Sequence, residues 1–355
     1  MKPAHPTPLP VPSSAIVQLE VVSPPNGRRT FRAAGLAFSL LAGLTAFAVS
    51  NPLRADLTEE QRRIPLEQEP ADPSLAKIVL LAGSVSNKAG QHEYFAGCAL
   101  LANWLRQTKG VWPVMVAEGW PANEAVFKGA KAVVVYADGG PKLPFLKEER
   151  WSLMKDLVAA GTGFVLLHQA VDVPEDRAAD ILSWLGGVWK KDIGCRGHWD
   201  MEFSEFPAHA VTRGLTPFAA PLDGWLYNLH FAPGIVPLVK GAVPEKSRST
   251  PDAKAHVDRQ EVVAWAYQRP AGGRSFAFTG CDLHRNWGVE SQRRLVTNGI
   301  LWSAGLEVPA EGAPVQTPGG ALGANLDAKP APAPKPAPAA APSTSETPSA
   351  APAAK

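Results

Sequence analysis

Short runs of consecutive apolar residues, separated by helical patterns, dominate the first half of the folded part of the chain. Four such runs occur, at residues 77–82, 112–117, 132–136 and 164–167. Runs of this length are typical of strands covered on both faces. Residues 94–108 and 148–160 instead place apolar side chains at helical spacing. The alternation predicts an α/β fold with a doubly wound, mostly parallel sheet, whose ligands gather beyond the carboxyl ends of the strands.

The second half of the pattern is less regular. We predict five further short strands, at residues 200–203, 225–229, 235–239, 262–267 and 275–279. Residues 292–304 show the spacing of a closing helix, and residues 187–258 are rich in aromatic residues, prolines and loop signals. We expect this region to form a loop-rich cap over the strand ends.

The N-terminal 55 residues have the features of an export signal. Arg28 and Arg29 precede Phe31, the stretch 33–49 is uncharged, and Ala55 offers a cleavage position. The apolar stretch is short and only moderately hydrophobic, which suits a secretory signal better than a permanent span. The paired arginines resemble a twin-arginine signal. We therefore predict a periplasmic or extracellular protein, with a retained N-terminal membrane anchor as the alternative.

The C-terminal residues 310–355 are dominated by alanine and proline. Large apolar side chains are scarce there, so burial cannot offset the entropy of ordering the segment. We predict a disordered tail over 310–355, a linker over 56–76 and one folded domain over 77–309.

Composition excludes several partners and cofactors. The chain has 35 basic and 33 acidic residues, a net charge of +2, so nothing in it predicts a nucleic-acid partner. It contains neither a glycine-rich dinucleotide motif nor a phosphate loop, so nucleotide cofactors are not expected. We interpret Cys98, Cys195 and Cys281 as structural, although a bridge between the last two remains open. The oligomeric state, including a homo-oligomer, is also left open.

Several sequence blocks together resemble one protein family. They include Gly90-Gln-His-Glu-Tyr94, Gly161-Thr-Gly-Phe-Val-Leu-Leu-His168, His198-Trp199, Val211-Thr-Arg-Gly214 and Asn298-Gly-Ile-Leu-Trp302. In order and spacing they resemble the ThuA-like (trehalose utilisation) family, from about residue 77 to residue 308. The resemblance implies a flavodoxin-like fold related to class I glutamine amidotransferases, and a link to carbohydrate metabolism.

The resemblance does not extend to glutamine hydrolysis. In the amidotransferases a nucleophilic cysteine occupies the sharp turn after a central strand. The equivalent position here is His168, and an imidazole does not replace a thiolate that must form a thioester.

Three histidines are predicted to reach the crevice above the sheet. His92 follows the first strand, His168 ends the fourth, and His284 follows the last predicted strand. Loops after neighbouring strands face the same crevice, so these imidazoles are expected to converge. With Asp282 they could bind zinc or another divalent ion and leave a position open for water. The alternative is that each is a structural histidine, and Glu93 is expected to serve a helix N-terminus.

Aromatic and polar side chains near these loops are candidates for binding a sugar. Aromatic rings pack on the C–H faces of pyranoses, and polar groups bond their hydroxyls. The candidates are Tyr94, His198, Trp199, Trp225, Tyr227, Asn286 and Trp287.

The chain departs from the family pattern at three places. The resemblance implies a histidine where Asn87 stands, an acid where Gly224 stands and a Gly-His pair where Cys281 and Asp282 stand. Two hypotheses follow. The first is a hydrolase, lyase or isomerase acting on a sugar or oxidised sugar, with His168 and His284 in acid–base or metal roles and Asp282 assisting. The second is a sugar-binding or accessory module without catalysis.

Overall fold

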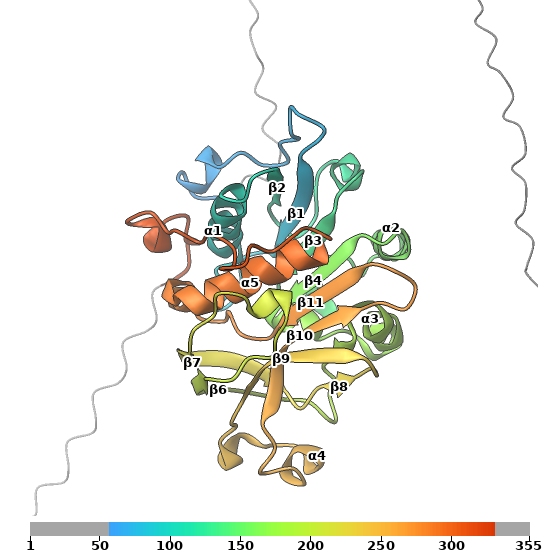
Figure 1. The fold of residues 1–355 in the computed structure, drawn as a ribbon, viewed down its shortest axis with the longest axis vertical. Coiled ribbons are helices and arrows are strands. Elements are labelled where there is room, and N and C mark those ends of the chain that lie inside the picture. The colour runs from blue at the N-terminus through green and yellow to red at the C-terminus, as the bar shows by residue number, and fades with distance from the viewer. Residues whose placement is uncertain (1–56, 331–355) are drawn as a thin grey trace, which may run out of the picture. The chain divides into compact units, whose positions relative to one another are not determined.

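The structure is a computed structural model that describes residues 57–330 (Figure 1). Its main sheet has seven strands in the order β2-β1-β3-β4-β11-β10-β9. Their bounds are Ala76–Ala82 for β1, Val111–Val116 for β2, Ala132–Tyr136 for β3, Gly163–Leu167 for β4, Ile235–Gly241 for β9, Glu261–Gln268 for β10 and Arg274–Phe278 for β11. The first five strands in this order run parallel, and β10 pairs antiparallel with both of its neighbours. The order of the parallel strands is that of the flavodoxin-like fold, so the predicted fold class is confirmed.

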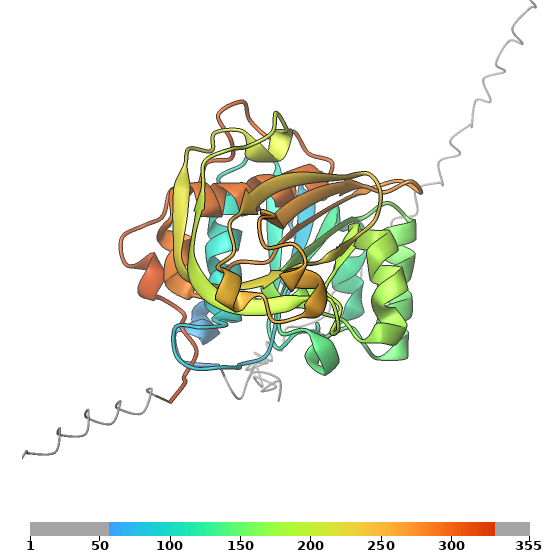
Figure 2. The same cartoon turned by 90° about the horizontal axis from the view of Figure 1, so that it is seen from below.

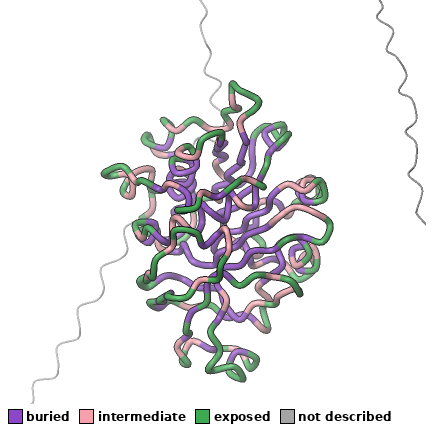
Figure 3. The backbone as a smooth tube through the Cα atoms, viewed as in Figure 1, coloured by how far each residue is buried: buried purple, intermediate pink, exposed green. Residues whose placement is uncertain are grey.

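Helices cover both faces of this sheet (Figure 1), and most of its strand residues are buried (Figure 3). Side chains alternate along a strand, so Ile78 and Leu80 of β1 face one side and Val79 and Leu81 the other. The first pair packs in the core with helices α1 (Tyr94–Arg106) and α5 (Glu290–Ser303). The second pair packs with α2 (Glu148–Ala159) and α3 (Ala178–Leu185). The sequence predicted all of these helices except α3.

The cap is more regular than the sequence suggests. Strands β6 (Cys195–Phe203) and β7 (Phe218–Tyr227) form a long antiparallel ribbon (Figure 2). Both are longer than predicted. In β6 buried and exposed positions alternate, and in β7 the buried run is confined to the second half of the strand, so neither strand shows a continuous apolar run over its whole length. Two-residue strands β5 (Gly187–Val188) and β8 (His230–Phe231) pair with each other, and α4 (Pro251–Lys254) is a single turn.

Both flanks of the predicted domain pack against it. Leu57 and Gln61 of the expected linker are buried, and a short 3-10 helix spans Gln61–Arg63. Ala313 and Val315 of the expected tail are also buried, so the prediction of disorder is wrong for residues 310–330. A few small apolar side chains and many backbone bonds hold this segment, and composition alone does not reveal them.

The remaining end predictions lie outside the described residues. These are the export signal, predicted for residues 1–55, and the tail from residue 331 onward. Within residues 57–330, no helix combines the length and the apolar character needed to cross a membrane. Cys98, Cys195 and Cys281 are all buried free thiols, which settles the open question of a bridge.

Candidate metal centre

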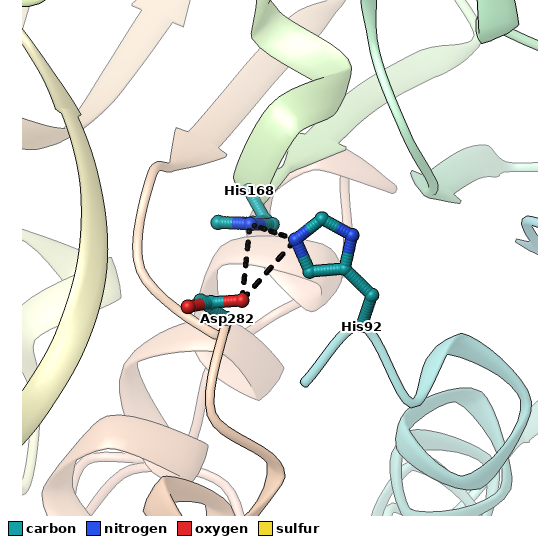
Figure 4. A group of neighbouring side chains, drawn as sticks. All are labelled: His92, His168 and Asp282. Atoms are coloured by element: carbon teal, nitrogen blue, oxygen red, sulfur yellow. Dashed lines mark hydrogen bonds and ion pairs between the residues drawn. The ribbon is translucent and has the colours of Figure 1, made fainter. Parts of the chain in front are cut away.

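Four loops at the carboxyl ends of the parallel strands bring polar side chains together. His92 lies between β1 and α1, Asp138 follows β3, His168 follows β4 directly, and Asp282 follows β11. His92, His168 and Asp282 point at one another (Figure 4). The carboxyl ends of these strands lie next to the point between β1 and β3 where the strand order reverses. Flavodoxin-like folds bind ligands at this point.

Three atoms of this group meet at short range. His92 Nε2 lies 3.1 Å from His168 Nε2 and 3.1 Å from Asp282 Oδ1. His168 Nε2 lies 3.8 Å from the same Asp282 oxygen. All three side chains are buried. We call His92, His168 and Asp282 the metal-site trio.

The hydrogen bonds of the two Nδ1 atoms show which ring nitrogens carry protons. His168 Nδ1 lies 3.1 Å from the carbonyl oxygen of Thr279, which can only accept, so this nitrogen carries a proton. His92 Nδ1 lies 2.8 Å from Asp138 Oδ1 and donates to that carboxylate. The neutral rings therefore present lone pairs at Nε2. Among residues 57–330, Asp282 Oδ1 has no hydrogen-bond partner. Three electron-pair donors thus face one another without a shared proton.

Asp138 forms an outer layer behind His92, and the sequence did not identify it. Its Oδ1 accepts from Tyr94 OH at 2.6 Å and from Ser86 Oγ at 3.0 Å, in addition to His92. A carboxylate bound to the far nitrogen of a histidine fixes the ring and raises its basicity, an arrangement common behind metal ligands. The signal available in the sequence was its place after a buried strand, the same signal that identified His168.

Asp282 is held by its side chain and its backbone. Its Oδ2 accepts from His198 Nε2 at 2.6 Å and from Gln91 Nε2 at 3.0 Å. Its carbonyl accepts from the His92 amide at 3.0 Å. The amides of Cys281 and Leu283, on either side, each donate to buried Asp223 at 3.0 Å. These bonds therefore fix the direction in which the Asp282 carboxylate points.

The electrostatics leave His168 and Asp282 in forms that bind cations. Burial first, and then the charge of His92, lower the pKa of His168 to about 4. Burial opposes protonation of His92 too, but the neighbouring carboxylates of Asp138 and Asp282 outweigh that effect and raise its pKa, so an ion would have to displace a proton from this ring. Burial would raise the pKa of Asp282, yet the two histidines lower it to about 2. At neutral pH His168 is therefore a lone-pair donor and Asp282 an anion, as metal ligands must be.

Backbone strain gathers at the same place. Asn87, His92, His168 and Cys281 have φ values of 58°, 50°, 56° and 76°. A residue other than glycine in this region costs on the order of 1–3 kcal/mol, and such residues cluster at functional sites. The strain at His168 turns its side chain to the crevice immediately where β4 ends.

Two hollows border the trio. The smaller has a volume of about 80 Å³ and is lined by the trio with Asn87, Gln169, Arg196, Gly197, His198, Gly224, Trp225 and Leu226. A cleft of about 720 Å³ lies beside it and shares His198. The three departures from the family pattern all fall at the smaller hollow. A Cβ on Gly224 would come within 2.5 Å of Asp282 Oδ2, so this carboxylate needs a glycine there.

The expected convergence of three imidazoles is wrong for His284. Its Nε2 donates to the Leu322 carbonyl at 3.1 Å, and the residue lines the large cleft. Asp282 takes the place predicted for it among the metal ligands. His284 begins a new 3-10 turn, His284–Gly288, which directs its ring to the C-terminal segment. The assignments of His284 as a metal ligand and as a catalytic partner of His168 are therefore corrected.

The predicted sugar-binding residues divide into three groups. His198 and Trp225 line the smaller hollow, and Tyr94 lies in the outer layer behind His92. The other four are at most 7% exposed and line none of the cavities described for residues 57–330: Trp199, Tyr227, Asn286 and Trp287. Trp199, Tyr227 and Trp287 belong to the hydrophobic core, and Asn286 is a buried polar residue. Glu93 occupies the cap position of α1, but its side chain makes no capping bond there.

Comparison with known proteins identifies one matching family. The sequence profile of the ThuA family, described as trehalose utilisation, matches residues 82–303. Among curated proteins none is similar enough to count as a relative. A ThuA-like protein of Bacteroides uniformis is 12% identical, with a TM-score of 0.48, over 66% of this chain and 94% of that one.

Two further solved structures also have low sequence identity and TM-scores below 0.5. A ThuA-like protein of Parabacteroides merdae is 15% identical, with a TM-score of 0.48, over 66% of this chain and 92% of its own. A glutamine amidotransferase of Thermotoga maritima is 10% identical, with a TM-score of 0.34, over 66% and 97% of the two chains. Because the family profile covers more than half of the sequence, the chain belongs to the ThuA family, which suggests a role in carbohydrate metabolism.

Proposed function

We propose that this protein is a carbohydrate-active enzyme that depends on one divalent metal ion, with His92, His168 and Asp282 as its ligands. The observation that carries the proposal is the meeting of two imidazole lone pairs and an unbonded carboxylate oxygen. A proton shared between the two Nε2 atoms would satisfy the imidazoles but would leave Asp282 Oδ1 without a partner among the described residues. A single cation satisfies all three atoms.

The spacing of the ligand atoms fits such an ion. With bonds of about 2.0–2.1 Å in a tetrahedral arrangement, neighbouring ligands lie about 3.3 Å apart. The observed separations are 3.1, 3.1 and 3.8 Å. Two imidazoles and one carboxylate are the ligand set of several catalytic zinc sites, which keep a fourth position open. An ion held in this way would polarise a carbonyl or lower the pKa of a bound water.

Two side chains around the trio can act on a substrate. The side chain of His198 is 56% exposed and stands between the smaller hollow and the cleft. Its Nε2 is bonded to Asp282, so its Nδ1 is free to exchange a proton with a bound molecule. Arg196 also lines the smaller hollow, pairs with Asp172, and has donors for a sugar oxygen.

The sizes of the hollows support a division of labour. About 80 Å³ admits water and the reacting end of a molecule, whereas small-molecule sites usually measure about 300–1,000 Å³. The cleft of about 720 Å³ falls in that range and offers the donors of Lys88 and Arg285. The body of a sugar would lie in the cleft and present a carbonyl or glycosidic oxygen past His198. This favours hydrolysis, elimination or isomerisation of a sugar or oxidised sugar.

We also propose that the protein is exported. The twin-arginine-like signal supports export to the periplasm or the cell exterior, the route for proteins that fold before export. An amidotransferase-like reaction is not supported, because His168 occupies the turn after β4 and all three cysteines are buried elsewhere. A sugar-binding role without catalysis is an outcome of the test below.

The test combines metal analysis with a panel of sugars and oxidised sugars. Purified full-length protein, reconstituted with zinc, manganese, cobalt or iron(II), should retain about one ion per chain. His168→Asn should lose the ion, and His256→Ala, a change at an exposed histidine, should keep it. Metal-dependent turnover in the panel supports the enzyme. Retained metal with sugar binding but no turnover supports the binding module, and failure to retain any of these ions contradicts the proposal.

A further inference from the structure

The structure assigns a positioning role to Lys329, a residue outside the family match at 82–303 and inside the segment whose composition predicts disorder. We infer that Lys329 holds the loop that carries His92 and thereby sets the geometry of the metal-site trio. The inference rests on the proposed metal centre. Its test is arranged so that the failure of one can be told from the failure of the other.

The side chain of Lys329 is 1% exposed, and its polar contacts are with residues 91–93 of the site loop and with Asp327. Its Nζ donates to the carbonyl oxygens of Gln91 at 2.5 Å and His92 at 3.0 Å. It also lies 3.2 Å from a carboxylate oxygen of Glu93 and 3.4 Å from one of Asp327. An ammonium has three N–H groups, so this environment satisfies it fully. Three consecutive residues of the site loop therefore depend on one cation.

Glu93 and Asp327 extend the contact in both directions. The Glu93 carboxylate accepts from the Gly90 amide at 2.8 Å and from the Asp327 amide at 2.9 Å. Asp327 Oδ1 in turn accepts from Gln61 Nε2 at 3.0 Å, which also bonds the Asn325 carbonyl. Hydrogen bonds thus link Asp327 of the C-terminal flank directly to the site loop, and Gln61 of the N-terminal flank to it through Asp327. We call residues 325–329, with Gln61, the C-terminal brace.

The brace acts on the backbone of a metal ligand. His92 is held at a φ of 50°, its amide donates to the Asp282 carbonyl, and its own carbonyl accepts from Lys329. These two bonds fix the strained peptide whose side chain must place Nε2 against the other ligands. Without Lys329, two buried carboxylates, Glu93 and Asp327, face each other without their cation. The loop would relax away from them, and the His92 ring would move with it.

The experiment compares full-length Lys329→Met with Lys77→Met. Methionine keeps the length and apolar stem of lysine without the charge. Lys77 is a matched control, because it is also a buried lysine in a carboxylate pair, but it lies at the start of β1, away from the site. Cobalt(II) is the probe, since its visible spectrum reports coordination geometry. We expect Lys329→Met to bind cobalt at least tenfold more weakly with an altered spectrum, and Lys77→Met to match the wild type in both.

Amide hydrogen exchange makes the result independent of the metal. The amides of residues 90–93 should exchange at least tenfold faster in Lys329→Met than in the wild type or Lys77→Met. If wild-type protein binds no cobalt, zinc, manganese or iron(II), the metal centre fails, and hydrogen exchange alone decides the role of the brace. The inference is overturned if amide exchange is unchanged in Lys329→Met. It is also overturned if the wild type binds cobalt and Lys329→Met binds it with the same spectrum and affinity. If Lys329→Met does not fold, Asp327→Asn replaces it, with the same readouts and the same criteria.

Discussion

Two clusters of charged residues, each formed around a buried carboxylate, differ in how their hydrogen-bond acceptors are satisfied. In the arginine cluster, formed by Arg248, Arg259 and Glu261, both carboxylate oxygens of Glu261 accept hydrogen bonds. Arg248 and Arg259 donate to Oε1 at 2.7 and 3.1 Å, and the Asn228 amide donates to Oε2 at 3.2 Å. In the metal-site trio, by contrast, lone pairs of two histidines and an oxygen of Asp282 meet without a donor.

The contrast separates a structural ion pair from a ligand site. Each cluster contains a buried carboxylate, Glu261 or Asp282, so burial or charge alone would not distinguish them. A carboxylate whose oxygens are all bonded has no capacity left for a ligand, whereas converging acceptors require one. Changes in the arginine cluster should therefore affect stability, and changes in the metal-site trio should affect metal binding.

The largest effect on stability is expected in the arginine cluster. Glu261→Gln leaves Arg248, whose side chain is fully buried, without its counter-charge. Breaking a buried pair in this way costs about 3–5 kcal/mol. Urea unfolding should show that loss, while the zinc content of the folded variant stays at the wild-type level. Loss of zinc without loss of stability would contradict the distinction between the clusters.

The opposite result is expected in the trio. Asp282→Asn keeps the size of the side chain but removes the anionic ligand, and amide oxygens are poor ligands for zinc. The affinity for zinc should fall by more than about a hundredfold, beyond the 10- to 100-fold typical of changes behind the ligands. Competition with a chromophoric chelator measures it. Retention of wild-type affinity would exclude Asp282 as a ligand.

A smaller effect is expected from Asp138, which contacts the trio only through His92. Asp138→Asn weakens the bond that fixes the His92 ring. The zinc affinity should fall by about 10- to 100-fold. The same chelator competition applies, and a loss as large as that of Asp282→Asn would make Asp138 a ligand instead.

The smallest effect is the pH dependence of the metal-free protein. Burial, followed by the charge of His92, lowers the pKa of His168 to about 4 from its ordinary 6.5. The unfolded chain therefore takes up a proton that the folded chain refuses, so this stability is present above pH 6.5 and is lost as the pH falls toward 4. His92 has a raised pKa, so its contribution is fully present below pH 6.5 and does not obscure this window. Urea unfolding in the presence of EDTA should show that the free energy of unfolding declines less steeply with falling pH in His168→Gln than in the wild type. Parallel declines in the two proteins would contradict this prediction.

The sequence predicted the parallel half of the fold because buried strands have a distinctive pattern. Residues 132–136 coincide with β3, and His168 was correctly placed at the end of β4. The same reasoning could have identified Asp138, but the glycines after it indicated only a turn. His284 was misplaced because a pattern of residue types does not show that the chain turns between Asp282 and His284.

The C-terminal brace lies beyond what a sequence pattern can predict. Lys329 stands among alanines and prolines, and its partners Gln91 and His92 are more than 200 residues away. Composition describes the average tendency of a segment to order itself, whereas here specific contacts, among them one buried cation with its carboxylates, help to hold the segment. The core position of Trp199 was missed for a related reason, because β6 alternates buried and exposed positions and has no continuous apolar run.

The central claim is that one divalent ion binds between His92, His168 and Asp282. Anomalous diffraction at the zinc edge, from crystals of the zinc-loaded protein, tests it most directly. The account predicts one peak about 2.0–2.2 Å from both Nε2 atoms and from Asp282 Oδ1. The absence of a peak there, or a peak in the cleft beside His284 instead, would contradict it.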